Sequence, residues 1–167
     1  AFTPAITTRK GRDCHTWRRH AHVVKTRDLT NTLMLLKRVT TIDVALPWLG
    51  YTVTVSIYGY LDNACDTVPI IEAVIERFSL KRLILKGDLN IPGEQTATWN
   101  STLNCSLAHI CLGSTWSTYM SQSDIDHAIV SREVLYSVQE AFTVDSALPT
   151  HRSIGITIDG AKGANTV

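Results

Sequence analysis

The sequence predicts a layered α/β fold, an α+β sandwich whose mixed, mostly antiparallel sheet carries flanking helices. Three stretches predict it. Apolar and polar residues alternate through "YTVTVSIYGY" (51–60), an apolar stripe with helical spacing follows in "DTVPIIEAVIERF" (66–78), and "KRLILKGD" (81–88) is almost continuously apolar. The composition agrees, because 44% hydrophobic and 19% charged residues are typical of a globular chain. At 167 residues the chain suits one domain.

A β-hairpin is predicted over residues 38–60. "RVTTIDVALP" (38–47) places β-branched residues in rough alternation and ends at a proline, "WLG" forms the turn, and 51–60 returns. In the returning strand one face carries Tyr51, Val53, Val55 and Ile57, and the other face carries Thr52, Thr54 and Ser56.

A helix and a buried strand come next. Asp66 or Thr67 can cap the helix, and Pro69 suits its first turn. Its apolar stripe consists of Ile70, Ile71, Val74, Ile75 and Phe78. The strand at 81–88 is apolar on both faces, which indicates burial on both sides.

The rest of the chain predicts further strands. A long connection covers 91–115, with a short helix expected around 97–105. "SDIDHAIVS" (123–131) alternates like a strand, "REVLYSVQEAFTV" (132–144) combines a turn of helix with a strand, and "HRSIGITID" (151–159) closes the sheet.

Charge and composition divide the chain into three predicted parts. Residues 1–32 read as a basic, poorly ordered arm, 33–160 as the domain, and 161–167 as a flexible tail. Residues 1–38 hold nine Lys and Arg against two Asp, although the net charge of the whole chain is only +1. A basic arm is compatible with binding to a polyanion such as nucleic acid. A solvated terminus explains the same charges equally well.

No membrane or secretory signal is evident. No run approaches the roughly 18 apolar residues of a membrane helix, and the start of the chain lacks the apolar core of a signal peptide. The four cysteines show no CxxC pair, so reduced thiols are expected. We therefore expect an intracellular protein, nuclear or cytoplasmic, without membrane association.

Polar side chains interrupt the predicted strands at their ends. These are Tyr58, Asp88 with Asn90, Asp126 and His151. Ends of strands are where sites collect in layered α/β proteins, because the sheet holds the groups while loops leave them accessible. Each also has a simpler interpretation: an Asx turn for Asp88 and Asn90, an ordinary ion pair for Asp126, a surface position for His151, and the end of a hairpin for Tyr58.

In order along the chain, "IYGY", "LKGDLN", "SDIDHAIVS" and "LPTHRSIGITI" resemble the second half of the endonuclease/exonuclease/phosphatase superfamily, which has the deoxyribonuclease-I-like fold. The family motifs are a strand ending in Tyr-(Gly/Val)-Pro, a GD(F/L/W)N motif, an (R/S)-x-(I/L)-D-(Y/H) motif and a terminal S-D-H-x-P. The resemblance covers about residues 35–158. Gly87–Asn90 and Asp124–Ser131 are its most specific parts.

The resemblance implies a role for each interrupting residue. Asp88 would orient or deprotonate the attacking water, and Asn90 would donate its amide hydrogens to a phosphate oxygen or help hold Asp88. His151 would donate to the phosphoryl oxygen, and Asp126 would fix its tautomer. Tyr58 would be a further donor near the phosphate. Mg²⁺, or Mn²⁺ in its place, would neutralise the developing charge.

Two departures from the family pattern affect the metal. Thr150 stands where the family has an Asp before the last His, and Tyr60 replaces the Pro of the Tyr-Gly-Pro pattern. The family's initial half supplies the Glu that is its chief metal ligand, yet the first Glu of this chain is Glu72. The implied domain is therefore partial, with the missing N-terminal half as a possible partner.

The leading hypothesis is a metal-dependent phosphodiester hydrolase impaired by these losses. Its expected partner is nucleic acid, DNA above all, and it could be a remnant of a non-LTR retroelement endonuclease. The alternative is a catalytically dead binding module of the same fold that contacts nucleic acid or protein. A third class, a structural domain with chance motifs, predicts that Asp126 and His151 lie far apart.

Overall fold

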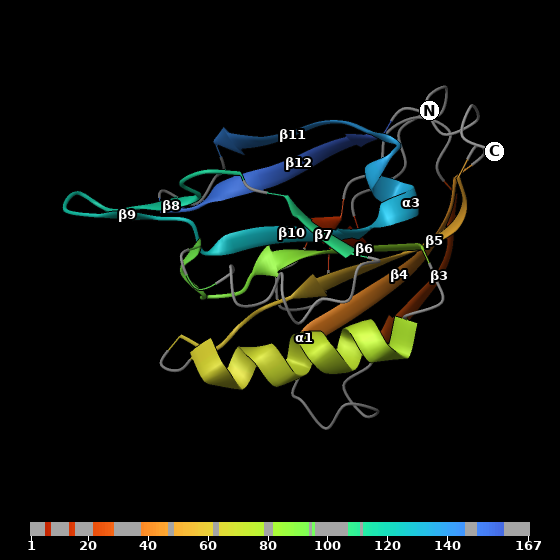
Figure 1. Cartoon of the computed structure of the whole chain (residues 1–167), viewed down its shortest axis with the longest axis horizontal. Helices are drawn as coiled ribbons and strands as arrows, with labels where there is room; N and C mark the ends of the chain where they lie inside the picture. The colour runs from red at the N-terminus through yellow and green to blue at the C-terminus, as the bar shows by residue number, and fades with distance from the viewer. Residues whose placement is uncertain are drawn as a thin grey trace.

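The structure is a computed structural model that describes residues 6–7, 14–15, 22–28, 38–46, 49–61, 64–78, 82–93, 95, 107–110, 112–145 and 150–158. A six-stranded mixed sheet forms the centre, in the spatial order β3 (His22–Asp28), β4 (Val39–Leu46), β5 (Gly50–Ile57), β6 (Arg82–Asp88), β10 (Asp126–Ser131) and β7 (Leu107–Ile110). Helix α1 (Ala64–Phe78) covers one face (Figure 1). The predicted layered α/β class is confirmed.

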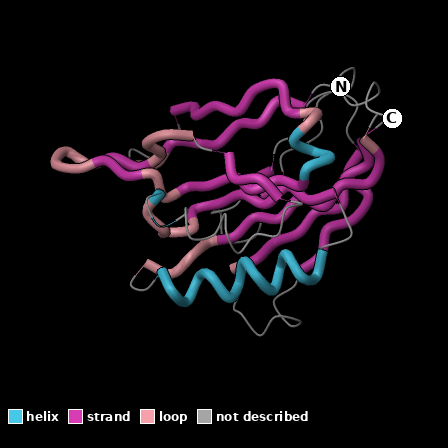
Figure 2. The backbone as a smooth tube through the Cα atoms, viewed as in Figure 1, coloured by secondary structure: helices cyan, strands magenta, loops and turns pink. Residues whose placement is uncertain are grey.

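Smaller elements complete the fold. The opposite side of the sheet carries α3 (Arg132–Leu135) and the two-stranded sheet of β11 (Val138–Asp145) and β12 (Arg152–Ile158). Helices α1 and α3 therefore lie on opposite sides in Figure 2. Two short hairpins pair β1 (Ile6–Thr7) with β2 (Cys14–His15) and β8 (Trp116–Ser117) with β9 (Gln122–Ser123).

Two apolar cores occupy the two faces of the sheet. On the helix side, Val53, Val55 and Ile57 of β5 and Leu83 and Leu85 of β6 pack against the apolar stripe of α1. On the other side, the core is formed by Ile42, Val44, Leu46, Leu49, Ile84, Val130 and Val134, with Val138, Ile156 and Ile158 of the β11–β12 hairpin packed against it. The prediction that the strand at 81–88 is buried on both faces is confirmed.

The chain crosses from β5 to β6 through α1, and these two strands are parallel. Their carboxyl ends therefore meet at one edge of the sheet. Strands β4 and β10 run antiparallel to these neighbours, so both begin at that same edge. The termini of four adjacent strands thus bring Arg38, Tyr58, Asp88 and Asp126 to one place.

The structure differs from the sequence prediction at several elements. Helix α1 begins at Ala64, two residues before the expected cap, and the hydroxyl of Thr67 accepts a hydrogen bond from the backbone N–H of Tyr60 (2.9 Å) instead of capping the helix. Strands β7, β8 and β9 were not predicted, because such short segments show no clear periodicity. The helix expected around 97–105 lies outside the described residues.

Part of the predicted basic arm belongs to the sheet. Residues 22–28 form strand β3, which pairs antiparallel with β4. The sheet therefore begins before residue 33. The assignment of a poorly ordered arm and of a flexible tail at 161–167 stays a prediction.

In the described part of the chain, none of the helices has the length and apolarity that crossing a membrane requires.

Candidate active site

Two carboxylates lie side by side where β6 ends and β10 begins. Asp88 is the last residue of β6, Asp126 is the first of β10, and the two are directly paired in the antiparallel register. Directly paired residues place their side chains on the same face of a sheet. Alternation from Ile84 and Val130 assigns this face to the side that carries the β11–β12 hairpin.

His151 completes a cluster with these carboxylates. It directly precedes β12 and forms an isolated antiparallel bridge with Trp116. Its Nδ1 lies 3.3 Å from Oδ2 of Asp126, and its Nε2 lies 4.0 Å from Oδ2 of Asp88. The side chains of His151, Asp88 and Asp126 are 26%, 16% and 11% exposed, so the cluster is mostly buried but still accessible to solvent. Asp126 and His151 therefore do not lie far apart, contrary to what the structural-domain alternative predicts.

The gap between Asp88 and His151 has a definite size. Their facing atoms are 4.0 Å apart, too far for a direct hydrogen bond. An oxygen atom could lie about 2.8 Å from each of these two atoms, an ordinary hydrogen-bond length, and the angle at that oxygen would be close to a right angle. The gap therefore suits one water or one phosphoryl oxygen, held by a carboxylate on one side and an imidazole on the other.

Asn90 shapes the loop after Asp88. Its backbone is in the left-handed region (φ +52°), and its N–H donates to Oδ1 of Asp88 at 3.2 Å. This is the Asx turn that the simpler interpretation expects. The other oxygen of Asp88, Oδ2, is the one that faces His151, so the turn and the cluster use different atoms of one carboxylate. The side-chain amide of Asn90 donates to the Gly59 carbonyl at 3.3 Å.

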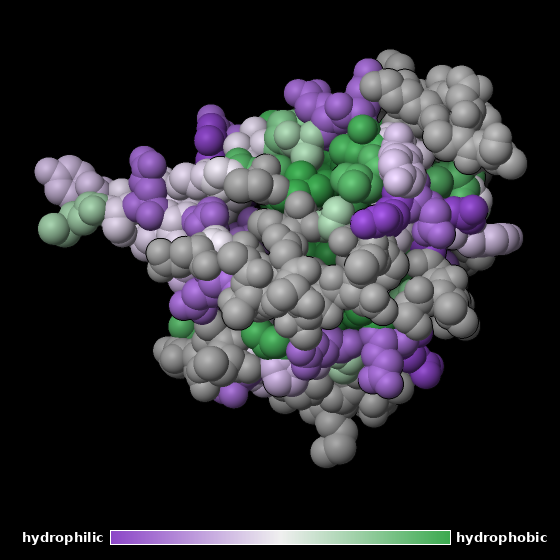
Figure 3. Space-filling view, in the orientation of Figure 1, coloured by the Kyte–Doolittle hydropathy of each residue, from purple (hydrophilic) through white to green (hydrophobic). Residues whose placement is uncertain are grey.

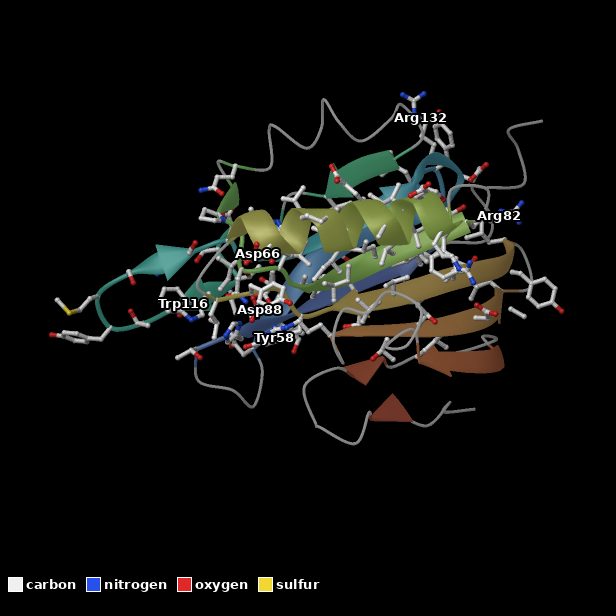
Figure 4. The ribbon with its side chains drawn as sticks, turned by 90° about the horizontal axis from the view of Figure 1, so that it is seen from below. Tyr58, Asp66, Arg82, Asp88, Trp116 and Arg132 are labelled. Carbon is white, nitrogen blue, oxygen red and sulfur yellow. The ribbon has the colours of Figure 1, made fainter. Side chains whose placement is uncertain are left out.

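Tyr58 lies at the same edge, directly after β5. Its N–H donates to the carbonyl of Arg38 (2.9 Å), and the Arg38 guanidinium lies 5.2 Å from the centre of the Tyr58 ring. Figure 4 shows Tyr58, Asp88 and Trp116 near one another, on the side of the molecule away from Arg82. The five residues singled out in the sequence are thus all at one edge of the sheet.

Glycines allow the two loops at this edge to touch. The N–H of Gly59 donates to the Asp88 carbonyl at 2.6 Å, and a Cβ on Gly59 would overlap the Leu89 backbone. Gly87 has a φ of +153°, which favours glycine, and a Cβ there would overlap the Ile57 carbonyl. The glycine of the "GDLN" motif is therefore required for close approach of β5 and β6.

Two residues beside Asp126 hold the loop that follows Asn90. Asp124 accepts a hydrogen bond from the Gly93 N–H (2.9 Å), and Nε2 of His127 lies 2.6 Å from the Ile91 carbonyl. Burial lowers the pKa of His127 below its usual 6.5, against the opposing effects of the Ile91 carbonyl and of the Asp124 and Asp126 carboxylates. His127 is therefore neutral near pH 7 and donates through Nε2–H.

Thr115 connects the two sheets behind the cluster. This fully buried residue accepts a hydrogen bond from the Asp126 N–H on its hydroxyl (2.9 Å) and one from the Arg152 N–H on its carbonyl (2.8 Å). Two residues after Thr115, the N–H of Ser117 donates a hydrogen bond to the carbonyl of Thr150 (2.9 Å). The segment at β8 thus fixes the start of β12 relative to the start of β10.

Sequence reasoning missed four of these residues: Arg38, Thr115, Asp124 and His127. Arg38 had a weak signal, since an arginine opposite "YGY" can stack on tyrosine. The aspartate and the histidine on either side of Asp126 stood inside the recognised motif. Thr115 had no signal, because its partners are 11 and 37 residues away in the chain.

The donor set is compatible with a divalent cation. One ligand atom from each of Asp88, Asp126 and His151 lies within 4.8 Å of the others. Asp126 is engaged with the imidazole, so Asp88 is the carboxylate better placed for a hard cation. Mg²⁺ is usually held by one or two carboxylates together with waters and substrate phosphate, so Asp88 fits it. Direct binding by His151 would suit Mn²⁺ or another transition ion better.

Comparisons with known proteins bear on the fold that carries this site. No family model and no curated protein sequence matches the chain significantly. Among solved structures, the endonuclease domain of TRAS1, a telomere-specific non-LTR retrotransposon, is similar over 95% of this chain and 78% of that one (16% identity, TM-score 0.67). The 3′-5′ exonuclease NExo from Neisseria meningitidis is similar over 83% and 70% (14% identity, TM-score 0.57).

A third similar structure is an endonuclease/exonuclease/phosphatase family protein from Bacteroides thetaiotaomicron. It is similar over 84% of this chain and 65% of that one, with 15% identity and a TM-score of 0.60. Identities this low establish the fold and leave the reaction open. The chain has the deoxyribonuclease-I-like fold of the endonuclease/exonuclease/phosphatase proteins.

Proposed function

We propose that this chain is a metal-dependent phosphodiester hydrolase directed at nucleic acid. The observation that carries the proposal is the convergence of Asp88, Asp126 and His151 from three strand ends. Oδ2 of Asp88 and Nε2 of His151 are 4.0 Å apart, so one oxygen atom beside them could contact both. Hydrolysis of a phosphodiester requires a water to be oriented and an anionic phosphoryl group to be stabilised. A carboxylate and an imidazole facing each other supply one group for each task.

Each residue has a defined action in this proposal. Asp88 orients the attacking water through Oδ2 and takes its proton as the new P–O bond forms, while the P–O bond to the leaving sugar oxygen breaks and that oxygen takes a proton from solvent. Asp126 accepts from Nδ1–H of His151, which fixes the ring so that Nε2 points at a phosphoryl oxygen. Asn90 sets the conformation of the loop and Tyr58 offers its phenol at the same edge. A bound Mg²⁺ or Mn²⁺, with Asp88 as its protein ligand, would offset the negative charge of the phosphate.

Nucleic acid is the substrate that the surroundings of the cluster favour. The β8–β9 hairpin projects from the body of the molecule (Figures 1 and 3), and its turn carries Tyr119 and Met120, 102% and 89% exposed. The hairpin starts at Trp116, which pairs with His151, so the projecting turn is rigidly connected to the cluster. An exposed aromatic side chain can stack on a base. Two similar structures, a Neisseria 3′ phosphatase with a product DNA hairpin and a D. rerio protein with a single-strand DNA product, support DNA.

Cleavage of labelled DNA oligonucleotides tests the proposal. The chain should cut them slowly with Mg²⁺ or Mn²⁺ and should stop in excess EDTA. Asp88→Ala and His151→Ala should each lower the rate by about 100-fold or more, as expected for lost acid–base groups. Glu72→Gln is the control, because this exposed carboxylate lies on α1, outside the cluster. Metal-independent cutting, or equal rates in all four proteins, would contradict the proposal.

A binding module without catalysis is the second candidate, and one observation favours it. Thr150 stands in the position where the resemblance implies a metal-binding Asp. Its carbonyl accepts a hydrogen bond from the Ser117 N–H, and its side chain brings no charge to the cluster. Under this reading no cleavage occurs with any divalent cation, while fluorescence anisotropy still detects binding of DNA. Tyr119→Ala would then weaken binding, and Asp88→Ala would leave it intact.

A further inference from the structure

The Arg38 side chain is bound on three sides at the edge of the sheet. Its Nη1 donates to the Gly59 carbonyl (2.7 Å) and to the Tyr58 carbonyl (3.3 Å). Its guanidinium carbon lies 4.2 Å from the centre of the Tyr60 ring and 5.2 Å from that of Tyr58, both within cation–π distance. One half-buried cation therefore holds the whole Tyr58–Tyr60 turn.

The Gly59 carbonyl passes this restraint to Asn90. The same oxygen that accepts from Arg38 also accepts from the side-chain amide of Asn90 (3.3 Å), and the Gly59 N–H donates to the Asp88 carbonyl. Asn90 is in the left-handed conformation, which a non-glycine residue keeps only where its surroundings support it. A displaced Gly59 carbonyl would remove one of those supports.

Arg38 also explains how the chain tolerates a departure from the family motif. Tyr60 stands where the Tyr-Gly-Pro pattern has a proline, whose fixed φ would stiffen the turn. Here the Tyr60 N–H donates to the Thr67 hydroxyl (2.9 Å), a bond that proline could not make, and the ring lies under the guanidinium. Packing against Arg38 replaces the rigidity of the proline ring.

We propose that Arg38 is a positioning residue of this site: through the Gly59 carbonyl it fixes Asn90, and through the turn it fixes Tyr58, beside Asp88. The expected effect on the cleavage rate rests on the proposed hydrolase function. The positioning of Asn90 and Tyr58 rests only on the hydrogen bonds and ring contacts of Arg38. Only arginine satisfies the contacts, because its planar guanidinium stacks with its face while donating in its plane, whereas lysine carries a compact ammonium.

Kinetics on the Mg²⁺-loaded chain test the connection to Asn90. Arg38→Met should lower kcat for oligonucleotide cleavage by about 10- to 100-fold, since small displacements of positioned groups cost about that much, and should change KM by less. Arg38→Lys should not restore the rate. In the Asn90→Ala background, Arg38→Met should lower kcat by a smaller factor than in the wild type, because the contribution through Asn90 is already lost and only the one through Tyr58 remains. Equal fold-losses in both backgrounds would overturn the proposal.

A second measurement does not depend on hydrolysis. The ¹H–¹⁵N NMR signal of the Asn90 side-chain amide, assigned by its loss in Asn90→Ala, should shift in Arg38→Met and in Arg38→Lys. It should stay in place in Arg132→Met, an exposed arginine on α3. If no protein cleaves DNA but the Asn90 signal shifts as expected, the proposed function fails and the role of Arg38 stands.

The Arg38 variants must be folded for their cleavage rates to be comparable with that of the wild type. Far-ultraviolet circular dichroism and urea midpoints would establish that each variant is folded before its rate is compared. If Arg38→Met unfolds, Arg38→Lys carries the test, because it keeps the aliphatic stem and the charge. A folded Arg38→Lys protein with the wild-type rate and an unmoved Asn90 signal would overturn the proposal.

Discussion

Nδ1 of His151 lies 3.3 Å from Oδ2 of Asp126, although the strand that Asp126 begins and the strand that His151 precedes belong to different sheets. Asp126 begins β10 of the central sheet, and His151 directly precedes β12 of the two-stranded sheet. Their distance therefore depends on how one sheet is fixed on the other. Hydrogen bonds of Thr115 and of the β8 segment provide that fixation at the site itself.

Replacing Asp126 should uncouple the imidazole while leaving the fold intact. Asp126→Asn keeps the size of the side chain but can present its N–H₂ to Nδ1, which disfavours the tautomer that donates there. We expect the cleavage rate to fall by about 100- to 10,000-fold, the usual range for a lost contribution to acid–base catalysis. Gel-based cleavage assays measure this, with Glu72→Gln as control. A rate within a few fold of wild type would show that the Asp126–His151 contact is only structural.

Thr115 should matter through its hydroxyl. Thr115→Val has nearly the same shape but leaves the Asp126 N–H without its acceptor, and an unsatisfied buried donor costs about 1–3 kcal/mol. Thr115→Ser keeps the oxygen and serves as the matched control, losing only a methyl group. Urea unfolding should rank the proteins as wild type, then Ser, then Val. If Val is as stable as Ser, the hydroxyl does not hold the start of β10.

Stability should fall in mild acid because of His127. Burial lowers its pKa in the folded state below 6.5, so above pH 6.5 the ring is mainly neutral in both states and its contribution is complete. As the pH falls below 6.5, the unfolded chain binds the proton more readily, and stability declines until the lower, folded-state pKa is passed. The slope for one proton is at most about 1.4 kcal/mol per pH unit.

Urea titrations between pH 7.5 and pH 5 test this contribution. His127→Gln can still donate to the Ile91 carbonyl but does not titrate, so its stability should change less with pH than that of the wild type. Parallel curves for the two proteins would assign the acid sensitivity to other groups.

Divalent-cation binding should depend on Asp88. A carboxylate oxygen is the preferred ligand of a hard cation, and an amide is a weaker one. Asp88→Asn should therefore weaken Mn²⁺ binding by at least about 10-fold, the lower end of the loss seen even for residues that act behind a metal ligand. Electron paramagnetic resonance of free Mn²⁺ measures the affinity, and Glu72→Gln is the control. Equal affinities would place the cation elsewhere.

Much of the fold could be predicted from local sequence. The alternation in 51–60 and the helical stripe in 66–78 predict the apolar side of each element, and the structure packs these two sides against each other in one core. Strand β7 and the short hairpins were not visible in the same way. A strand of four residues has too few alternations to be recognised, and its pairing with β10 supplies the stabilisation that its own sequence does not indicate.

The sequence by itself determined the candidate chemistry: Tyr58, Asp88, Asn90, Asp126 and His151 stand out because polar groups interrupt apolar strands. Tertiary structure alone decided their distances and their supports. Arg38 reaches the Tyr58–Tyr60 turn and Thr115 joins Asp126 to Arg152 because strand order and register set which distant backbone groups face each other. A hydrogen bond forms only where the fold brings donor and acceptor to short, well-aligned positions. Because these partners are far apart in the chain, no local sequence pattern indicates them.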